Sequence, residues 1–262
     1  MAFPEAPRVL YELNPLHEVI CQLRFPPVLR IETEVPSGFQ ERIRASFPYY
    51  EAKPSLKLPP GLTPDVVSSL IQGTPLGLGP THEFSSADKQ WVVSLTREFL
   101  ALTCRRYERW ERFRDMLRGP LDALLEIYTP SFYTRVGLRY IDLIRRSVLG
   151  LDQVGWDQLL KPWVAGPFGS PEIASTVEYA ASDFLIAVPE IESRLRVRHG
   201  AVLHPDSQES CYLIDADFFD ERRTEITDVF PRFDALNRQA GLFFRWCIRD
   251  RLHEAMRPRP LV

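Results

Sequence analysis

The clearest structural pattern in the chain is SFYTRVGLRYIDLIRR, residues 131–146. β-branched and aromatic residues dominate it, and Pro130 just before it would end a preceding helix, so the pattern predicts a long strand. Side chains alternate between the two faces of a strand, which places Arg135, Gly137 and Arg139 on one face. The apolar residues expected on the opposite face are Val136, Leu138 and Tyr140. A sheet face that carries arginines is expected to be solvated, paired with acids or bound to another molecule.

Several elements are predicted before this strand. In chain order they are a strand at residues 16–25, a short helix capped by Ser37, strands at residues 83–97 and 99–105, and a helix at residues 107–128. Residues 52–82 are rich in Pro, Gly and Ser and predict an irregular excursion. The succession through residue 146 is β-α-β-β-α-β, which is ferredoxin-like. We therefore expect an antiparallel sheet with helices on one face.

A second set of strands is predicted after residue 150, closed by a long helix. In chain order the elements are a helix at residues 156–164, strands at residues 176–181, 184–188, 193–203 and 210–218, and a helix at residues 224–256 interrupted near Pro231. The predicted fold class is thus α+β, with antiparallel sheets flanked by helices. The expected halves are residues 1–150 and 151–262, and whether they form one continuous domain is left open.

The composition of the chain favours some classes of protein and makes others unexpected. The chain has 262 residues, of which 45% are hydrophobic and 26% charged, as in globular proteins. The formal net charge of −3 provides no overall basic field for nucleic acid. The four cysteines lie far apart in apolar patterns and are expected to be buried, reduced thiols of a cytoplasmic protein. They are Cys21, Cys104, Cys211 and Cys247. The first residues of the sequence include acidic ones where a signal peptide needs a continuous apolar run, and no run of about 18 apolar residues occurs, so neither an export signal nor a membrane partner is expected.

Several motifs occur together in a fixed order. They are NPLHEVICQLRF at residues 14–25, REFLALTCRRYERWERF at 97–113, RVGLRYIDLI at 135–144, CYLIDADFF at 211–219 and RWCIRDRLHEAM at 245–256. In this order the chain resembles a sporadically distributed, functionally uncharacterised prokaryotic family of similar length. The resemblance covers most of the chain outside residues 52–82. It implies a patchily inherited accessory protein, of the kind found in defence or toxin-control loci, and it assigns no catalytic residues.

An arginine row is the first candidate site. The predicted strand at residues 193–203 carries three arginines on one face, namely Arg194, Arg196 and Arg198. Together with Arg135 and Arg139 they are candidate binding residues, because guanidinium groups on one sheet face can hold phosphate, nucleic acid or an acidic partner.

Asp215 and Asp217 support two other hypotheses. They alternate on one face of the following strand, so they can form cross-strand ion pairs with the arginine row and leave a merely solvated face. The same D-x-D pattern is also a weak candidate for binding Mg²⁺ beside a phosphate. Whether the arginines are paired with these aspartates or available to a ligand is not decided by the sequence.

The leading functional hypothesis is a non-enzymatic binding or regulatory protein that acts through a protein partner, in an accessory defence or toxin-control locus. One alternative is a metal-dependent nucleotide- or phosphate-directed enzyme that uses the arginine row and the Asp215/Asp217 pair. Another is a nucleic-acid-binding protein. No catalytic residue and no cofactor are predicted, and a homo-oligomer is left open.

Overall fold

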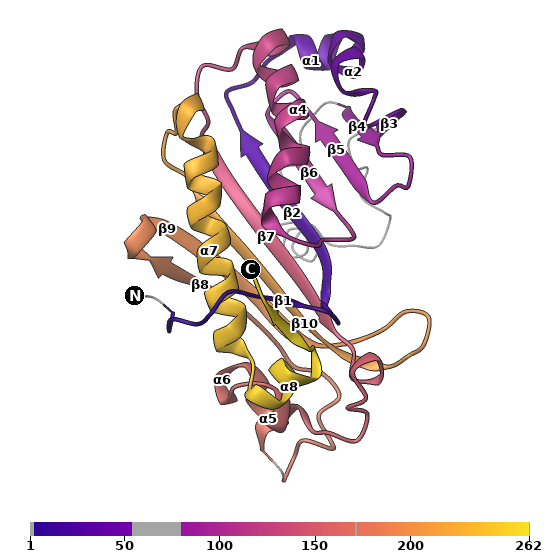
Figure 1. The fold of residues 1–262 in the computed structure, drawn as a ribbon, viewed down its shortest axis with the longest axis vertical. Helices are drawn as coiled ribbons and strands as arrows, with labels where there is room; N and C mark the ends of the chain where they lie inside the picture. The colour runs from indigo at the N-terminus through magenta and orange to yellow at the C-terminus, as the bar shows by residue number, and fades with distance from the viewer. Residues whose placement is uncertain (1–2, 54–79, 171, 262) are drawn as a thin grey trace.

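The computed structural model describes residues 3–53, 80–170 and 172–261 (Figure 1). Its described strands form one nine-stranded sheet, in which every neighbouring pair is antiparallel, and one two-stranded sheet. From edge to edge, the large sheet consists of β3 (Tyr49–Lys53), β4 (Thr81–Ser85), β5 (Trp91–Leu95), β6 (Phe99–Cys104), β2 (Leu16–Arg24), β7 (Arg135–Ile144), β10 (Ser210–Asp220), β9 (Ser193–Leu203) and β8 (Ala181–Val188). The predicted α+β class is confirmed.

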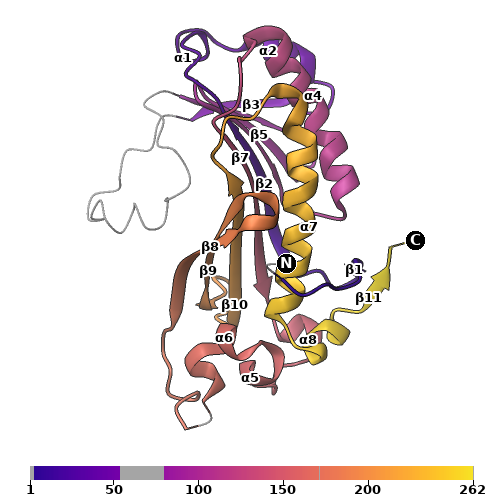
Figure 2. The same cartoon turned by 90° about the vertical axis from the view of Figure 1, so that its left-hand side faces the viewer.

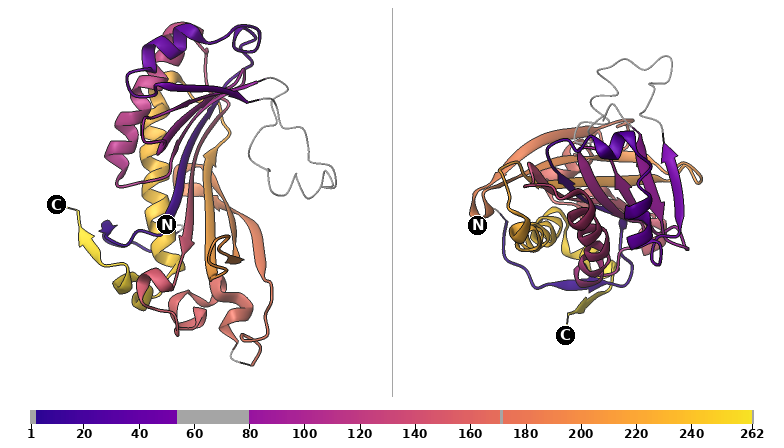
Figure 3. Two further views of the ribbon diagram at one scale, coloured as in Figure 1. Left: turned by 90° about the vertical axis from the view of Figure 1, so that its right-hand side faces the viewer. Right: turned by 90° about the horizontal axis from the view of Figure 1, so that it is seen from above.

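The helices differ greatly in length. The long ones are α4 (Trp110–Tyr128) and α7 (Val229–Cys247), and the short ones are α1 (Arg30–Thr33), α2 (Ser37–Ile43), α5 (Trp156–Leu159), α6 (Pro162–Ala165) and α8 (Asp250–Ala255). Figures 2 and 3 show α4 and α7 side by side on one face of the large sheet, which curves around them. No helix in the described parts of the chain is both long enough and apolar enough to cross a bilayer.

The predicted strand at residues 131–146 is β7, and it lies near the middle of the sheet. It pairs with β2 on one side and with β10 on the other. The predicted division at residue 150 therefore falls between two strands of the same sheet. Residues from both sides of it contribute to one hydrophobic cluster between the sheet and the helices. The apolar face predicted for β7 is buried in this cluster, at Val136, Leu138 and Tyr140.

Two strands at one side of the sheet, β3 and β4, extend the predicted N-terminal succession. Residues 81–95 form a β4–β5 hairpin where one strand was predicted at residues 83–97, because Asp88 stabilises a turn: its Oδ1 accepts a hydrogen bond from the Ser86 hydroxyl at 2.6 Å and from the Gln90 N–H at 3.0 Å. β3 then adds to the outer edge of β4. Most of the predicted excursion, residues 54–79, lies outside the described residues.

The C-terminal helix is interrupted at a different position from the predicted one. Pro231 lies in the first turn of α7, where its missing N–H costs no helical hydrogen bond. The interruption is at Ile248, which leaves the helix to form a β-bridge with Leu160 before α8 begins. Thr224, the predicted helix start, instead pairs with Tyr133.

The two ends of the chain meet on the helical side of the large sheet. β1 (Val9–Tyr11) pairs with β11 (Pro258–Pro260) in the two-stranded sheet. Figure 2 shows this pair beside α7, away from the opposite face of the sheet. The N-terminal segment consequently crosses the molecule on the side where α4 and α7 pack.

Candidate functional site

The predicted arginines lie on the sheet face opposite α4 and α7, and all of them form ion pairs. We call this surface the arginine face. Its arginines are Arg135, Arg139, Arg194, Arg196 and Arg198, and the acids paired with them are Asp183, Asp215, Asp217 and Glu221. The partners come from β8 and β10 and from the residue after β10, so the pairs run across neighbouring strands.

Arg135 forms the most enclosed of these pairs. Its Nη2 donates to both carboxylate oxygens of Asp217, at 2.9 and 2.8 Å, and its Nη1 donates to Oε1 of Gln22 at 3.1 Å. The side chains of Arg135 and Asp217 are only 8% and 14% exposed. The guanidinium also lies 4.8 Å from the ring centre of Phe219. Gly137 makes room for it, because a Cβ at that position would be 2.2 Å from Nη1 of Arg135.

Gly137→Ala is expected to lower the free energy of unfolding by about 2 kcal/mol, because the new methyl group displaces the guanidinium from Asp217. Urea denaturation measures the change. The same substitution in an Arg135→Met background is the control and should cost much less, since there is no longer an ion pair to break. Equal costs in the two backgrounds would show that Gly137 has another role.

Arg139 and Asp215 form a two-point pair. The Nε and Nη2 atoms of Arg139 donate to the two oxygens of Asp215, each at 2.6 Å. Nη1 of Arg198 lies 3.4 Å from the same carboxylate, which is 6% exposed. Because β10 lies between β7 and β9, the carboxylate of Asp215 separates two guanidiniums that would otherwise repel each other.

Asp183 on the edge strand β8 is a partner that sequence analysis missed. It receives hydrogen bonds from Nε and Nη2 of Arg196 at 3.0 and 2.7 Å, and Nε of Arg198 lies 3.5 Å from it. Arg194 pairs with Glu221 at 3.4 Å near the surface. Alternation on β8 could have indicated Asp183, but only with the order of the strands known.

Asp215 and Asp217 are therefore ion-paired, but their closest partners are Arg139 and Arg135 of β7, and from the arginine row of β9 Arg198 approaches Asp215 at 3.4 Å. Binding of a partner by the arginine face stays a prediction. Within residues 3–53, 80–170 and 172–261, no group of three or more His, Cys, Asp and Glu residues is placed to hold a metal ion.

Arg24 also belongs to this sheet face, although the sequence did not single it out. It lies opposite Arg135 in the β2–β7 register. Its side chain forms no ion pair or hydrogen bond with another described residue, and its Nε is buried. Desolvation lowers the pKa of Arg24, and the charge of Arg135 lowers it further. An anion bound beside Arg24 would reduce the repulsion between the two guanidiniums.

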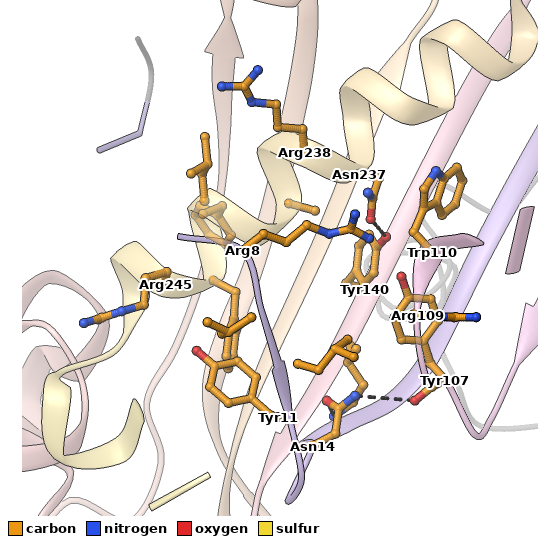
Figure 4. A pocket seen from close by; sticks show the side chains of 18 of the residues that line it. Arg8, Tyr11, Asn14, Tyr107, Arg109, Trp110, Tyr140, Asn237, Arg238 and Arg245 are labelled. Carbon is orange, nitrogen blue, oxygen red and sulfur yellow. Dashed lines mark hydrogen bonds between the residues drawn. The ribbon is translucent and has the colours of Figure 1, made fainter. Parts of the chain in front are cut away.

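The opposite, helical side of the sheet has a cleft of about 730 Å³, which we call the α4–α7 cleft. Its walls are residues 5–16 of the N-terminal segment, residues 107–118 at the start of α4 and residues 234–245 of α7, and its floor includes Tyr140, Asp142 and Ala216 of the sheet. Figure 4 shows Arg8 extending from the N-terminal segment in the direction of Tyr140 and Asn237.

The rim of the cleft carries charges in pairs. Arg8 pairs with Glu111 at 2.8 Å and ties the N-terminal segment to α4. Asp234 of α7 is 3.2 Å from Nη1 of Arg114 and accepts a hydrogen bond from the Trp110 indole N–H at 2.6 Å. These contacts hold together the segments that form the cleft.

The floor of the cleft is aromatic and polar. The Tyr140 hydroxyl donates to Oδ1 of Asn237 at 2.8 Å. The Tyr107 ring meets the Tyr140 ring edge to face, with centroids 5.9 Å apart. Burial raises the pKa of both phenols, so their hydroxyl groups stay protonated at neutral pH. They can therefore donate hydrogen bonds as well as accept them.

Asp142 is the unusual residue of the floor. It follows Tyr140 on the apolar face of β7, between Leu16 of β2 and Ile214 of β10. It is 4% exposed, and no described residue donates a hydrogen bond to its carboxyl group or forms an ion pair with it. Desolvation, with a smaller contribution from the charge of Asp215, raises its pKa from 3.8 to about 8. At neutral pH the carboxyl group is therefore mostly protonated.

No protein-family model matches this chain, and no curated protein matches it. Functional inference consequently depends on the side chains themselves.

The sequence contained one signal for the cleft. Asp142 continues the alternation of Val136, Leu138 and Tyr140, so it is a charged residue at a position where an apolar one is expected. Apart from Tyr140 and Ala216 of the sheet, the remaining cleft residues belong to the distant segments 5–16, 107–118 and 234–245, and no local pattern links these segments.

Proposed function

We propose that the protein is a non-enzymatic binding protein that holds a small organic molecule in the α4–α7 cleft. The observation that carries this proposal is the cleft itself, about 730 Å³ in volume with a buried, unpartnered carboxyl group on its floor. Small-molecule sites are typically about 300–1,000 Å³, mostly apolar, with a few polar groups that orient the ligand. The α4–α7 cleft has each of these features.

The arginine face supports a non-catalytic role over the enzymatic alternative. To bind Mg²⁺, Asp215 and Asp217 would have to give up their hydrogen bonds with Arg139 and Arg135. Breaking enclosed ion pairs costs about 3–5 kcal/mol each. A site selected for metal binding would not be expected to hold its ligands in this way.

We retain the other parts of the leading hypothesis as proposals. They are a regulatory role through a protein partner, a cytoplasmic location, and membership of the prokaryotic accessory family that the sequence resembles. What supports them is the set of motifs quoted above, from residues 14–25 to residues 245–256.

Gly241 provides a test of the cleft. It lines the cleft on α7, and a Cβ there would have no neighbour within 4 Å. Gly241→Phe should therefore extend a ring into the cleft from a Cβ that meets no other atom, and helix propensity favours Phe over Gly. The matched control is Gly119→Phe on α4, since Gly119 also has free space around it but lies outside the cleft lining.

The measurement is a thermal-shift screen of small organic molecules. A ligand present at about 100 times its Kd should raise the Tm of the wild type by roughly 5 °C. We expect the shift to be lost in Gly241→Phe and kept in Gly119→Phe. Ligands that stabilise both variants equally, or the absence of any stabilising molecule, would contradict the proposal.

A further inference from the structure

The carboxyl group of Asp142 is buried without a hydrogen-bond or ion-pair partner among the described residues. Transferring a polar group into an apolar environment is unfavourable unless it gains a hydrogen bond. At 4% exposure, Asp142 has lost nearly all its contact with bulk water, yet no described side chain or backbone N–H compensates. It does line the α4–α7 cleft, so a molecule in the cleft can reach it.

The titratable groups that interact with Asp142 are all acids. Tyr140 belongs to its own strand, Asp215 to β10, Tyr11 to the N-terminal segment and Cys247 to the end of α7. Leu16 is its neighbour on β2, and it cannot titrate.

The nearby bases are engaged elsewhere. Nδ1 of His253 lies 2.8 Å from the hydroxyl of Tyr11, and Arg245 pairs with Asp250. The other arginines that line the cleft are Arg8, Arg109, Arg114, Arg118 and Arg238, and none of the described bases forms an ion pair or a hydrogen bond with Asp142.

The walls around Asp142 are rich in aromatic rings. Those lining the cleft are Tyr11, Tyr107, Trp110, Tyr140, Phe243 and Phe244. The faces of such rings carry negative electrostatic potential and attract organic cations. Aromatic walls together with one buried carboxyl group favour a ligand that is apolar over most of its surface and positively charged at one end.

We propose that the α4–α7 cleft binds an organic amine cation whose ammonium group pairs with the Asp142 carboxylate. This inference rests on the proposed function and specifies its ligand class. When the cation binds, the O–H bond of the carboxyl group breaks, its proton passes to the solvent, and the ammonium group forms an ion pair with the carboxylate. No other bond changes.

Proton release makes the inference measurable. Because the pKa of Asp142 is raised to about 8 in the free protein, binding of a cation at pH 7 should release about one proton. The Kd should also fall about tenfold when the pH rises from 6 to 7, and it should level off above the pKa.

The experiment is calorimetric titration with three probes of matched shape at millimolar concentration: 2-phenylethylammonium, 2-phenylethanol and phenylacetate. Repeating the titration in phosphate and in Tris buffers gives the number of protons released. The proteins are the full chain, Asp142→Asn, and a control Asp122→Asn on the exposed side of α4. Asparagine has the shape of the protonated acid, so the cleft should keep its geometry.

We expect the ammonium probe to bind at least tenfold more tightly than the alcohol and to release about one proton. Asp142→Asn should remove this preference and the proton release while still binding the alcohol, and Asp122→Asn should change neither. Tighter binding of the alcohol or of phenylacetate to the wild type, or equal ammonium binding in Asp142→Asn, would overturn the inference and leave the binding function in place. Failure of all three probes to bind would overturn both.

Discussion

Asp142→Asn is expected to become more stable than the wild type as the pH rises. The difference in the free energy of unfolding between variant and wild type should grow by about 4 kcal/mol from pH 5 to pH 8. In the folded wild type the pKa of Asp142 is about 8, whereas in the unfolded chain the carboxyl group has its ordinary pKa of 3.8. Between these values the folded state binds one more proton than the unfolded state. The free energy of unfolding therefore falls by about 1.4 kcal/mol for each pH unit and levels off above about pH 8.

The measurement is urea denaturation at several pH values from 4 to 9, with the difference between variant and wild type plotted against pH. Asparagine does not titrate, so this difference should be near zero at pH 4 and should grow as the pH rises. Asp122→Asn, at an exposed position of α4, should give a difference close to zero throughout. Parallel curves for Asp142→Asn and the wild type would mean that the Asp142 carboxyl group is already ionised at neutral pH.

Arg135→Met is expected to lower the free energy of unfolding by about 3 kcal/mol. Methionine keeps much of the apolar volume of the arginine stem, but Asp217 then loses the Nη2 atom that donates to both its oxygens. The Asp217 side chain is only 14% exposed, so water replaces the lost hydrogen bonds poorly. Denaturation in urea at pH 7 measures the loss.

The double variant Arg135→Met/Asp217→Leu distinguishes a lost ion pair from lost packing. Removing both charges leaves no unpaired group, so the double variant should be more stable than Arg135→Met. In the double-mutant cycle of Arg135→Met, Asp217→Leu and the double variant, the coupling energy between the two side chains should be about 2 kcal/mol or more. Additive losses would show that the pair does not stabilise the fold. Arg194→Met is the exposed control and should cost less than about 1 kcal/mol.

The strands of the large sheet were largely predictable because a strand half-buried against helices leaves a period of two in the sequence. This period located β9 at residues 193–203, in agreement with the structure, and β7 within residues 131–146. It failed at residues 83–97, where two short strands follow each other and the Asp88 turn interrupts the pattern too briefly to divide it.

Helix ends were less predictable, because they depend on competing partners. Nothing local to Ile248 marks it as the end of α7, since its backbone leaves the helix to meet Leu160, distant in sequence. Pro231 looked like an interruption, although a proline in the first turn is compatible with a helix.

Alternation and composition determined the α+β class, the face of β7 that is buried, and the expectation that Asp215 and Asp217 can neutralise the arginine row. These follow from the chain because a strand places every second side chain on the same face whatever it pairs with.

The tertiary structure decided which acid meets which arginine, since that depends on strand order and brings in Asp183 from the sheet edge. The tertiary structure also forms the α4–α7 cleft, because the walls of the cleft come from three segments that are distant in the sequence. The raised pKa of Asp142 has the same origin, because desolvation depends on the residues packed around the carboxyl group. Those residues surround Asp142 only when the N-terminal segment, α7 and the sheet are packed together.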